Sequence, residues 1–326
     1  MNTRMFGKTN VAISEIGLGT WQLGTRWGDE FNEVEAQRIL QIAYEQGINF
    51  IDTADVYNGG LSEKAIGEFI KDKKDDFYIV TKAGRYLNPH IDEQYTIENI
   101  EGFVDSSLSR LGVEKLDMVL LHCPPSSVYR KDSLFTGLDK MKLSGKIANY
   151  GVSIEKVNEG IAAMDYDIAG IEVIFNMFRL KPLDELFTLT KKNDIGVIAR
   201  VPLASGLLTG RYDKTTSFGE GDHRTFNRDG AAFDKGETFS GVDYNLGLTA
   251  VEELKKLFGT NDLIPHALRW ILMHDAVSVV IPGASKASQV ISNVRAAEID
   301  ALTPIQMKGV QDIYEKYIRN DVHPNW

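Results

Sequence analysis

The feature that most restricts the fold of this chain is a series of eight short apolar runs spread along most of its length. Most of these runs are continuously apolar, a pattern typical of parallel strands that are covered on both faces. The expected strands cover residues 16–19, 50–52, 78–82, 118–122, 147–152, 171–175, 197–201 and 277–281.

Segments with helical periodicity separate most of these runs. They cover residues 33–46, 63–71, 97–111, 133–143, 154–164 and 183–191. Eight strands with intervening helices fit a closed α/β fold, the (β/α)8 TIM barrel, better than an open sheet. The length permits two ordinary domains or one large barrel, and we expect a single barrel domain over residues 1–326. An alternating segment that turns at residues 8–10 predicts an N-terminal β-hairpin.

A Rossmann sheet is the competing fold, and a glycine fingerprint after its first strand would identify it. The stretch GLGTWQ has Gly17 and Gly19, but Gln22 occupies the position of the third glycine, and no helix begins there. The fingerprint is incomplete, so the pattern favours the barrel.

Composition excludes several classes of function. A net charge of -10 disfavours a general nucleic-acid binder, because phosphate contacts need clustered Lys and Arg. No segment approaches the roughly 20 apolar residues that span a bilayer, and the N-terminus lacks the apolar stretch of a secretory signal. The single cysteine, Cys123, fits a reducing compartment. We therefore expect a cytoplasmic protein without a membrane partner; the helical patterns do not indicate its oligomeric state.

Three successive strands of the expected barrel end in an ionisable residue. The runs FID, FYIVTK and DMVLLH finish at Asp52, Lys82 and His122, and Tyr57 follows the first of them on a glycine-rich loop. Taken singly, each has a structural explanation, such as a turn former, a packed phenol, a solvated lysine or a buried histidine. In a (β/α)8 barrel, however, the strand ends meet at one face, where catalytic groups lie. Their corresponding positions favour one convergent site.

The chemistry of these four groups fits proton transfer to an oxygen. A phenol has an ordinary pKa near 10; a nearby ammonium lowers that pKa, and a carboxylate keeps the ammonium charged and oriented. A histidine beside the phenol can bind and polarise a carbonyl oxygen. Such a site protonates an oxygen that gains negative charge, as in the reduction of a carbonyl by hydride.

Other reaction types are less well supported. The sequence has no HExxH, CxxC or P-loop motif, and its six histidines are scattered, so we predict no metal site. Cys123 adjoins His122, but neighbouring strand residues point to opposite faces, so we expect no Cys–His dyad. Asp52 and Asp55 could help to hold a divalent ion, as in a metal-dependent barrel hydrolase or isomerase, although Lys82 would be an unfavourable neighbour.

Around these residues the sequence resembles the aldo-keto reductases over nearly the whole chain. The resemblance rests on DTADVY, VTK, VDSSLSRLGVEKLDMVLLHCP, GKIANYGVS, VPLASGLLTG and IPGASKASQVISN. It implies a (β/α)8 barrel that binds NADP(H) without a Rossmann domain and transfers hydride between nicotinamide and a carbonyl or alcohol. Its catalytic tetrad falls on Asp52, Tyr57, Lys82 and His122. Tyr57 would be the acid in reduction and the base in oxidation, tuned by Lys82 and Asp52, while His122 would orient the carbonyl.

The resemblance also implies a set of nucleotide contacts. Glu172 stands where the family has a glutamine, so it either binds the nicotinamide amide through one side, is held protonated, or has another role. Arg200 replaces a tyrosine that stacks on the nicotinamide in many relatives. Lys286 is the expected partner of a 2'-phosphate, which favours NADP(H) over NAD(H). The expected cofactor residues are Thr20, Trp21, Ser153, Glu172, Arg200, Pro202, Leu203, Gly206, Leu207, Gly283, Ser285, Lys286, Gln289 and Asn293.

Residues 211–245 form a long aperiodic connection after the seventh strand, and such connections often act as lids. The predicted function is reduction of an aldehyde, ketone or sugar-like carbonyl, or the reverse oxidation, on a small molecule. The expected substrate wall consists of Trp21, Tyr57, Arg85, Tyr86, Tyr129 and Arg130. The alternative is a nucleotide-sensing regulatory protein that binds the cofactor with little turnover.

Overall fold

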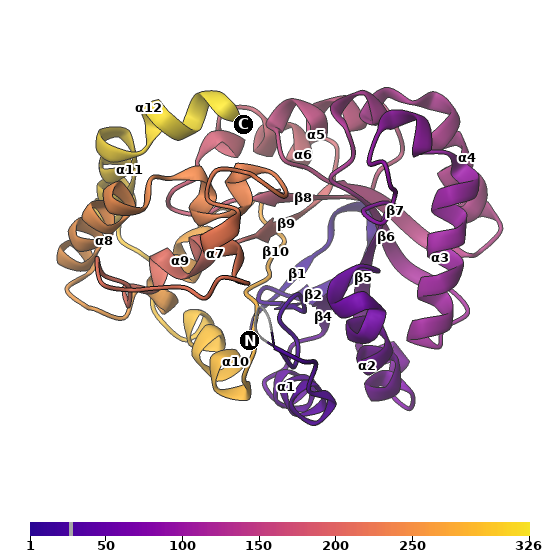
Figure 1. Cartoon of the computed structure of the whole chain (residues 1–326), viewed down its shortest axis with the longest axis horizontal. Helices are drawn as coiled ribbons and strands as arrows, with labels where there is room; N and C mark the ends of the chain where they lie inside the picture. The colour runs from indigo at the N-terminus through magenta and orange to yellow at the C-terminus, as the bar shows by residue number, and fades with distance from the viewer. Residues whose placement is uncertain (26–28) are drawn as a thin grey trace.

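The computed structural model describes residues 1–25 and 29–326. Its main feature is one sheet of eight parallel strands, arranged in the order in which they occur in the sequence (Figure 1). The strands are β3 (Leu18–Gly19), β4 (Phe50–Asp52), β5 (Tyr78–Ala83), β6 (Leu116–His122), β7 (Ile147–Ser153), β8 (Gly170–Ile174), β9 (Gly196–Arg200) and β10 (Val279–Val280).

Backbone hydrogen bonds between the first and last strands close this sheet. The amide of Gly17 donates to the carbonyl of Val280 at 2.9 Å, and the amide of Val280 donates to the carbonyl of Glu15 at 3.0 Å. A parallel bridge also joins Gly19 to Gly283. The predicted (β/α)8 barrel is therefore confirmed. The seam is held by isolated bridges, so β3 and β10 are shorter than the apolar runs that predicted them.

The expected N-terminal hairpin is present and covers the end of the barrel at which the strands begin. It consists of β1 (Thr3–Met5) paired antiparallel with β2 (Ala12–Ser14). Phe6, which follows β1, is fully buried, and its ring lies 5.7 Å from the rings of both Phe50 and Tyr78. A Cβ at Gly196 would lie 2.6 Å from the Phe6 ring, so a glycine is required there. Apolar side chains thus occupy the amino-terminal end of the barrel, opposite the polar strand ends.

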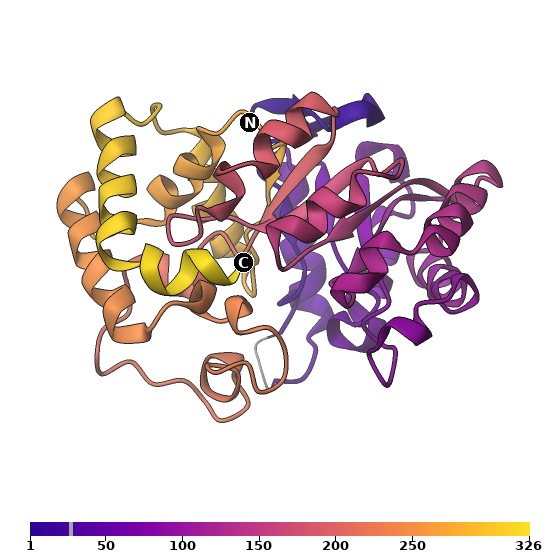
Figure 2. The same cartoon turned by 90° about the horizontal axis from the view of Figure 1, so that it is seen from above.

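Helices surround the sheet (Figures 1 and 2). The six expected helices are present, within a few residues of their predicted limits, as α1 to α6. The helices are α1 (Glu33–Glu45), α2 (Leu61–Ile70), α3 (Ile97–Leu111), α4 (Asp132–Leu143), α5 (Val157–Ala163), α6 (Leu186–Lys192), α7 (His223–Phe226), α8 (Tyr244–Phe258), α9 (Ile264–Leu272), α10 (Ala287–Val294), α11 (Pro304–Tyr317) and α12 (Arg319–Val322). Among the described residues, no helix is long and apolar enough to cross a membrane.

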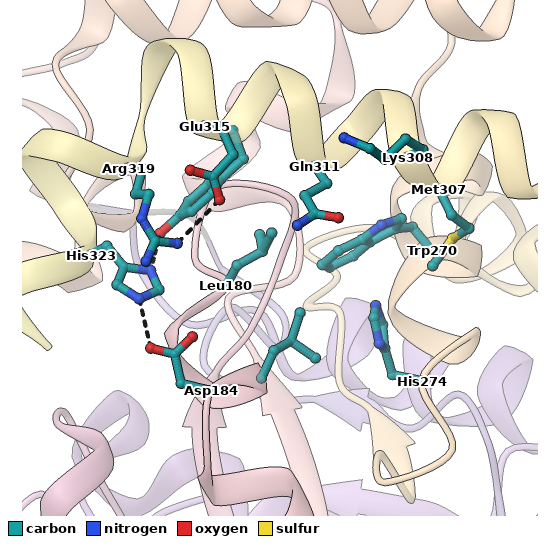
Figure 3. A pocket seen from close by; sticks show the side chains of 12 residues that line it. Leu180, Asp184, Trp270, His274, Met307, Lys308, Gln311, Glu315, Arg319 and His323 are labelled. Carbon is teal, nitrogen blue, oxygen red and sulfur yellow. Dashed lines mark hydrogen bonds and ion pairs between the residues drawn. The ribbon is translucent and has the colours of Figure 1, made fainter.

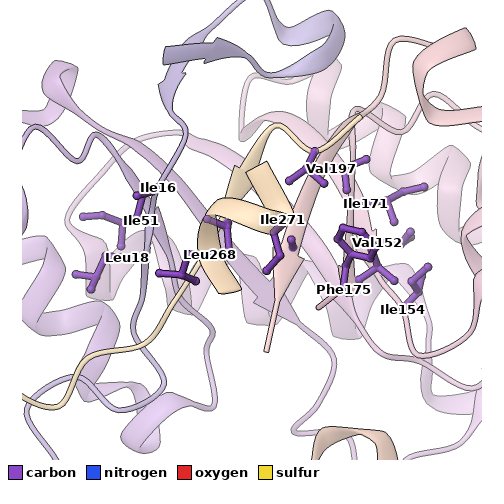
Figure 4. Packing of buried hydrophobic residues seen from close by; sticks show 14 of the residues in the cluster. Ile16, Leu18, Ile51, Val152, Ile154, Ile171, Phe175, Val197, Leu268 and Ile271 are labelled. Atoms are coloured by element: carbon purple, nitrogen blue, oxygen red, sulfur yellow. The ribbon is translucent and has the colours of Figure 1, made fainter. Parts of the chain in front are cut away.

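The hydrophobic core lies between the sheet and the helices. Ile51, Val152 and Val197 project outward from their strands, and Leu268 and Ile271 of α9 belong to the same buried cluster (Figure 4). All five side chains are at most 1% exposed. Because the outward face of the sheet is covered in this way, its strands are apolar on both faces, which explains their continuous apolar sequence.

Residues 211–245 leave the barrel wall after β9 and contain α7 and short 3-10 turns (Figure 2). The C-terminal Trp326 packs against the base of this segment. Its ring lies 3.7 Å from the guanidinium carbon of Arg179, and its indole nitrogen donates to Asp234 at 2.9 Å. A Cβ at Gly241 would lie 2.4 Å from the indole ring. The chain end therefore docks on the segment that was expected to act as a lid.

Candidate active site

Three of the four expected tetrad residues meet in direct contact at the carboxyl ends of β4 and β5. The Lys82 ammonium lies 2.6 and 2.7 Å from the two carboxylate oxygens of Asp52 and 3.3 Å from the Tyr57 hydroxyl. It also donates to the carbonyl of Thr53 at 2.9 Å. Lys82 is fully buried and Asp52 is 3% exposed. The lysine is thus held by a short, charge-assisted contact with Asp52.

A tight turn presents the Tyr57 phenol to the strand ends. Tyr57 begins the 3-10 turn Tyr57–Gly60, in which Asn58 (φ 51°) and Gly59 (φ 64°) adopt left-handed conformations. These conformations suit asparagine and glycine, the residues present there. The ring of His122, at the end of β6, lies 6.1 Å from the Tyr57 ring and nearly perpendicular to it. The fourth expected tetrad member therefore borders the phenol.

The surroundings of the tetrad fix its protonation. Burial lowers the pKa of His122 well below its ordinary value, and the Lys82 charge lowers it further, so the imidazole is neutral at neutral pH. For Tyr57, burial raises the pKa more than the Lys82 charge lowers it, and the charges of Asp52 and Glu172 raise it further. The net pKa of the phenol is raised. The expected lowering by the Lys82 ammonium is present, but burial, which the sequence pattern did not take into account, outweighs it.

Glu172 and Arg200 lie beside the tetrad. Glu172 is 2% exposed; one of its oxygens lies 3.4 Å from the Lys82 ammonium, and the other accepts from the Ser153 hydroxyl at 3.3 Å. Arg200 lies 3.7 Å from Glu172 and forms a 2.5 Å ion pair with Glu237 of segment 211–245. The glutamate at the expected glutamine position is therefore part of the charged network around Lys82.

A cavity of about 270 Å³ opens above these groups and extends toward the start of α10. Its wall includes an unusual turn after β9, in which Val201 (φ 52°), Ala204 (φ 47°) and Ser205 (φ 55°) are left-handed. Such strained residues concentrate at ligand sites. The lining residues are Gly19, Trp21, Gln22, Asp52, Tyr57, Glu172, Arg200, Val201, Pro202, Leu203, Ser205, Gly206, Thr209, Tyr212, His223, Arg224, Glu237, Ile281, Pro282, Gly283 and Gln289.

The other expected cofactor residues lie around this cavity. Thr20 is buried and donates to the Asp52 carbonyl, and Leu207 is buried in the core, so both support the wall from behind. Asn293 is 5% exposed and donates to the Gly283 carbonyl at 3.4 Å. These three residues are placed to shape the cavity.

The far end of the cavity is formed by the turn before α10. Gln289 accepts from the Ser285 and Lys286 amides at 2.7 and 3.1 Å, which caps the helix. Ser285 and Lys286 also line an adjoining hollow of about 520 Å³. Lys286 is exposed, and no ion pair to it occurs in the described part of the chain. A free ammonium beside a helix start suits an anionic group.

Sequence reasoning missed the residues that segment 211–245 contributes. Tyr212, His223, Arg224 and Glu237 line the cavity, and the His223 ring lies 5.2 Å from the ring of Trp21. No local signal marks these residues, because the segment lacks periodicity and its path is set by contacts with the barrel. Gln22 was noted as a failed glycine position, and it lines the cavity instead.

Two expectations near His122 need correction. Tyr129 is fully buried and donates to the Ser153 carbonyl, so it is not part of a substrate wall. Cys123 does not continue the strand: its backbone is left-handed (φ 47°), and its sulfur lies 3.5 Å from the Ser153 hydroxyl. The alternation argument against a Cys–His dyad therefore fails. The thiol is nevertheless neutral at physiological pH, because burial raises its pKa to about 12.

A cluster of possible metal ligands lies next to this cysteine. The Cys123 sulfur and carboxylate oxygens of Glu155 and Glu237 lie within 4.8 Å of one another. The Arg200 guanidinium already binds Glu237 and approaches the Cys123 sulfur at 3.7 Å. Because a cation of the protein occupies this cluster, we assign no metal to it.

Another hollow, of about 310 Å³, lies between α9, α11 and α12 (Figure 3). Trp270 and Leu180 line it, and two pairs of polar groups meet across it: His323 with Asp184, and Arg319 with Glu315. None of the tetrad residues borders it. The cavity at the strand ends is therefore the candidate active site.

Comparison with known proteins agrees with this geometry. The model of the aldo/keto reductase family matches residues 15–315. Aldo-keto reductase YhdN of Bacillus subtilis is 30% identical, with 98% of this chain and 95% of that protein aligned. A putative voltage-gated potassium channel subunit beta of Schizosaccharomyces pombe is 29% identical over 95% of this chain and 92% of its own. The holo form of aldo-keto reductase AKR11C1 from Bacillus halodurans superposes with a TM-score of 0.77 at 27% identity, covering 96% of each chain. The chain belongs to the aldo-keto reductase family, whose members are oxidoreductases.

Proposed function

We propose that the protein transfers hydride between NADP(H) and a small aldehyde, ketone or sugar-like carbonyl or alcohol, with Tyr57 as general acid and base. The observation that carries this proposal is the contact of the buried Lys82 ammonium with both the Asp52 carboxylate and the Tyr57 hydroxyl. A bound nicotinamide would supply the hydride. The residues of the chain would then supply the proton and hold the oxygen that receives it.

In this proposal each tetrad member has one task during reduction. Tyr57 gives its hydroxyl proton to the carbonyl oxygen as negative charge develops there, and Lys82 stabilises the phenolate that remains. Asp52 keeps Lys82 charged and in place. Neutral His122 donates a hydrogen bond to the carbonyl oxygen and orients it. The raised pKa of Tyr57 keeps the phenol protonated at neutral pH, which is the form that donates the proton in reduction.

The residues of the cavity fit a nicotinamide dinucleotide. Ser153 and Glu172 lie beside the tetrad, where they can hold the nicotinamide amide, and the turn at Pro202–Gly206 can border the pyrophosphate. Lys286 is placed to bind a 2'-phosphate, which supports NADP(H) over NAD(H). We propose further that residues 1–326 form one domain and that residues 211–245 cover the bound cofactor. The single buried thiol supports a reducing, cytoplasmic location for the protein.

The test combines nucleotide binding with turnover. The purified protein is titrated with NADPH and NADH by fluorescence, and NADPH oxidation is then followed against aldehydes, ketones and aldoses. In Tyr57→Phe we expect a loss of turnover of about 10²-fold or more, because a positioned proton donor contributes a factor of that size, with NADPH binding retained. Equal turnover in Tyr57→Phe and the wild type would refute the role of Tyr57.

The second candidate is a nucleotide sensor with little turnover. The 29% identity to a putative voltage-gated potassium channel subunit beta, over 95% of this chain, favours it. Tight NADPH binding without turnover on any substrate in either direction would support the sensor and contradict the reductase.

A further inference from the structure

The Lys82 ammonium is surrounded by more acceptors than it has protons. An ammonium has three N–H donors. The nearest acceptors are Asp52, at 2.6 and 2.7 Å, and the Thr53 carbonyl, at 2.9 Å. The Tyr57 hydroxyl at 3.3 Å and a Glu172 oxygen at 3.4 Å are more distant, and they compete for the N–H groups that the nearer acceptors leave available. The competition is unequal, because a contact to an ionised acceptor is about twice as strong as one to a neutral acceptor.

The Glu172 oxygen that faces Lys82 accepts no hydrogen bond from the described residues, although Glu172 also interacts with Asp52. Glu172 is 2% exposed, and this oxygen (Oε2) is buried without a hydrogen bond in the described part of the molecule. The other oxygen accepts from Ser153 at 3.3 Å. The guanidinium of Arg200 is 3.7 Å from that second oxygen and is itself bound to Glu237 at 2.5 Å. Lys82 is therefore the cation that interacts with the free oxygen.

We infer that Glu172 is a positioning residue that acts on Tyr57 through Lys82: it draws the ammonium away from the phenol and so holds Tyr57 in its protonated form. This inference rests on the proposed function, in which Tyr57 is the proton donor. A glutamine at this position would have the same shape and no charge, and the ammonium would then be free to approach the phenol. Glu172 thus keeps Tyr57 in the phenol form that donates a proton in reduction, and it raises the pH at which the phenolate needed for oxidation forms.

The electrostatics of the site agree with this geometry. Burial is the largest cause that raises the pKa of Tyr57; the Lys82 charge opposes it, and the Asp52 and Glu172 charges add to it. For Lys82, burial lowers the pKa, but the charges of Asp52 and Glu172 outweigh burial, so its pKa is raised and the residue stays charged. Removal of the Glu172 charge would therefore leave Lys82 protonated while lowering the pKa of the phenol.

The experiment compares Glu172→Gln with the wild type and with Glu15→Gln. The control makes the same change at a buried glutamate that lies outside the cavity and pairs with Arg4 at 3.3 Å. For each protein, kcat/KM for oxidation of an alcohol by NADP+ is measured from about pH 6 to about pH 10. In Glu172→Gln we expect the increase of kcat/KM with pH to move to lower pH by about one unit. Oxidation at about pH 8 should then be up to ~10-fold faster than in the wild type. Glu15→Gln should leave the position of the rise unchanged.

A second measurement does not need turnover. Tyrosinate absorbance is titrated with alkali in the protein without substrate, and the contribution of Tyr57 is found by subtracting the titration of the same protein with Tyr57→Phe. We expect Tyr57 to ionise at lower pH in Glu172→Gln than in the wild type; Glu172→Met replaces this variant if the amide prevents folding. An unchanged Tyr57 titration overturns the inference, and so does an equal displacement in Glu15→Gln. If no substrate turns over, the proposed function fails, while the titration still decides the role of Glu172.

Discussion

Replacement of Lys82 by methionine removes the buried ammonium that contacts the carboxylates of Asp52 and Glu172 at the strand ends. Lys82 is fully buried, and its contacts with Asp52 at 2.6 and 2.7 Å and with the Thr53 carbonyl at 2.9 Å are all lost in Lys82→Met. Removing one partner of a buried ion pair costs about 3–5 kcal/mol, because the other charge remains buried without compensation. The folded-to-unfolded ratio should therefore fall by a factor between roughly 10² and 10⁴.

The loss of stability in Lys82→Met should increase as the pH rises. In Lys82→Met, Asp52 is buried beside the Glu172 charge without its cation, so its folded-state pKa exceeds the unfolded value of about 3.9. Above about pH 4 the folded variant then binds more protons than the unfolded chain, and its stability falls as the pH rises. In the wild type the pKa of Asp52 is also raised, chiefly by burial and then by the Glu172 charge, but the Lys82 charge opposes this rise. The deficit of the variant relative to the wild type should be smallest near pH 4 and grow toward neutral pH.

Urea denaturation at several pH values measures this deficit directly. The matched control is Lys286→Met, which makes the same chemical change at an exposed lysine that forms no ion pair among the described residues and should alter stability by less than about 0.5 kcal/mol. A loss below about 1 kcal/mol in Lys82→Met at neutral pH, or a loss independent of pH, would refute the view that the ammonium balances two buried carboxylates.

Two further predictions concern the cofactor and the barrel. Lys286→Met should weaken NADPH binding about 10-fold and NADH binding by less than about twofold, because one charge-assisted contact to the 2'-phosphate is lost; fluorescence titration measures both, and equal weakening would contradict this role. Gly151→Ala should lower the free energy of unfolding by about 3 kcal/mol or more, because its Cβ would lie 2.1 Å from the Gly170 carbonyl oxygen. Gly102→Ala, with no neighbour within 4 Å, should instead stabilise α3 by up to ~1 kcal/mol. Urea midpoints compare the two, and a similar loss in both would show that close packing is not the cause.

The strands could be predicted because each is covered on both faces. An apolar run such as residues 118–122 records that burial directly in the sequence, and β6 lies over Leu116–His122. The helices α7 to α12 were not among the expected ones, although α9 is almost wholly buried. This helix has only nine residues, and a short apolar segment does not distinguish a helix from a strand reliably. The seam between β3 and β10 is held by isolated bridges, which have no signature in the sequence.

The site residues that could be predicted are those at equivalent positions on successive strands. Asp52 and Lys82 both end strands, so a barrel brings them together whatever lies between them in the sequence. The contribution of Glu237 could not be predicted, because it lies in an aperiodic segment that returns to Arg200 across the cavity. Tyr129 was assigned to a substrate wall by its proximity in sequence to His122, and only its burial shows otherwise.

The sequence by itself determined the barrel, the family and the identity of the groups at the strand ends, because these depend on local pattern and on the repetition of one structural unit. Only the tertiary structure decided how those groups act on one another. The pKa of Tyr57 is raised, and Lys82 lies 3.4 Å from a second carboxylate, Glu172. Both facts depend on burial and on distances between side chains from different strands. Burial weakens solvation and strengthens charge interactions at once, so their balance is a property of the folded site.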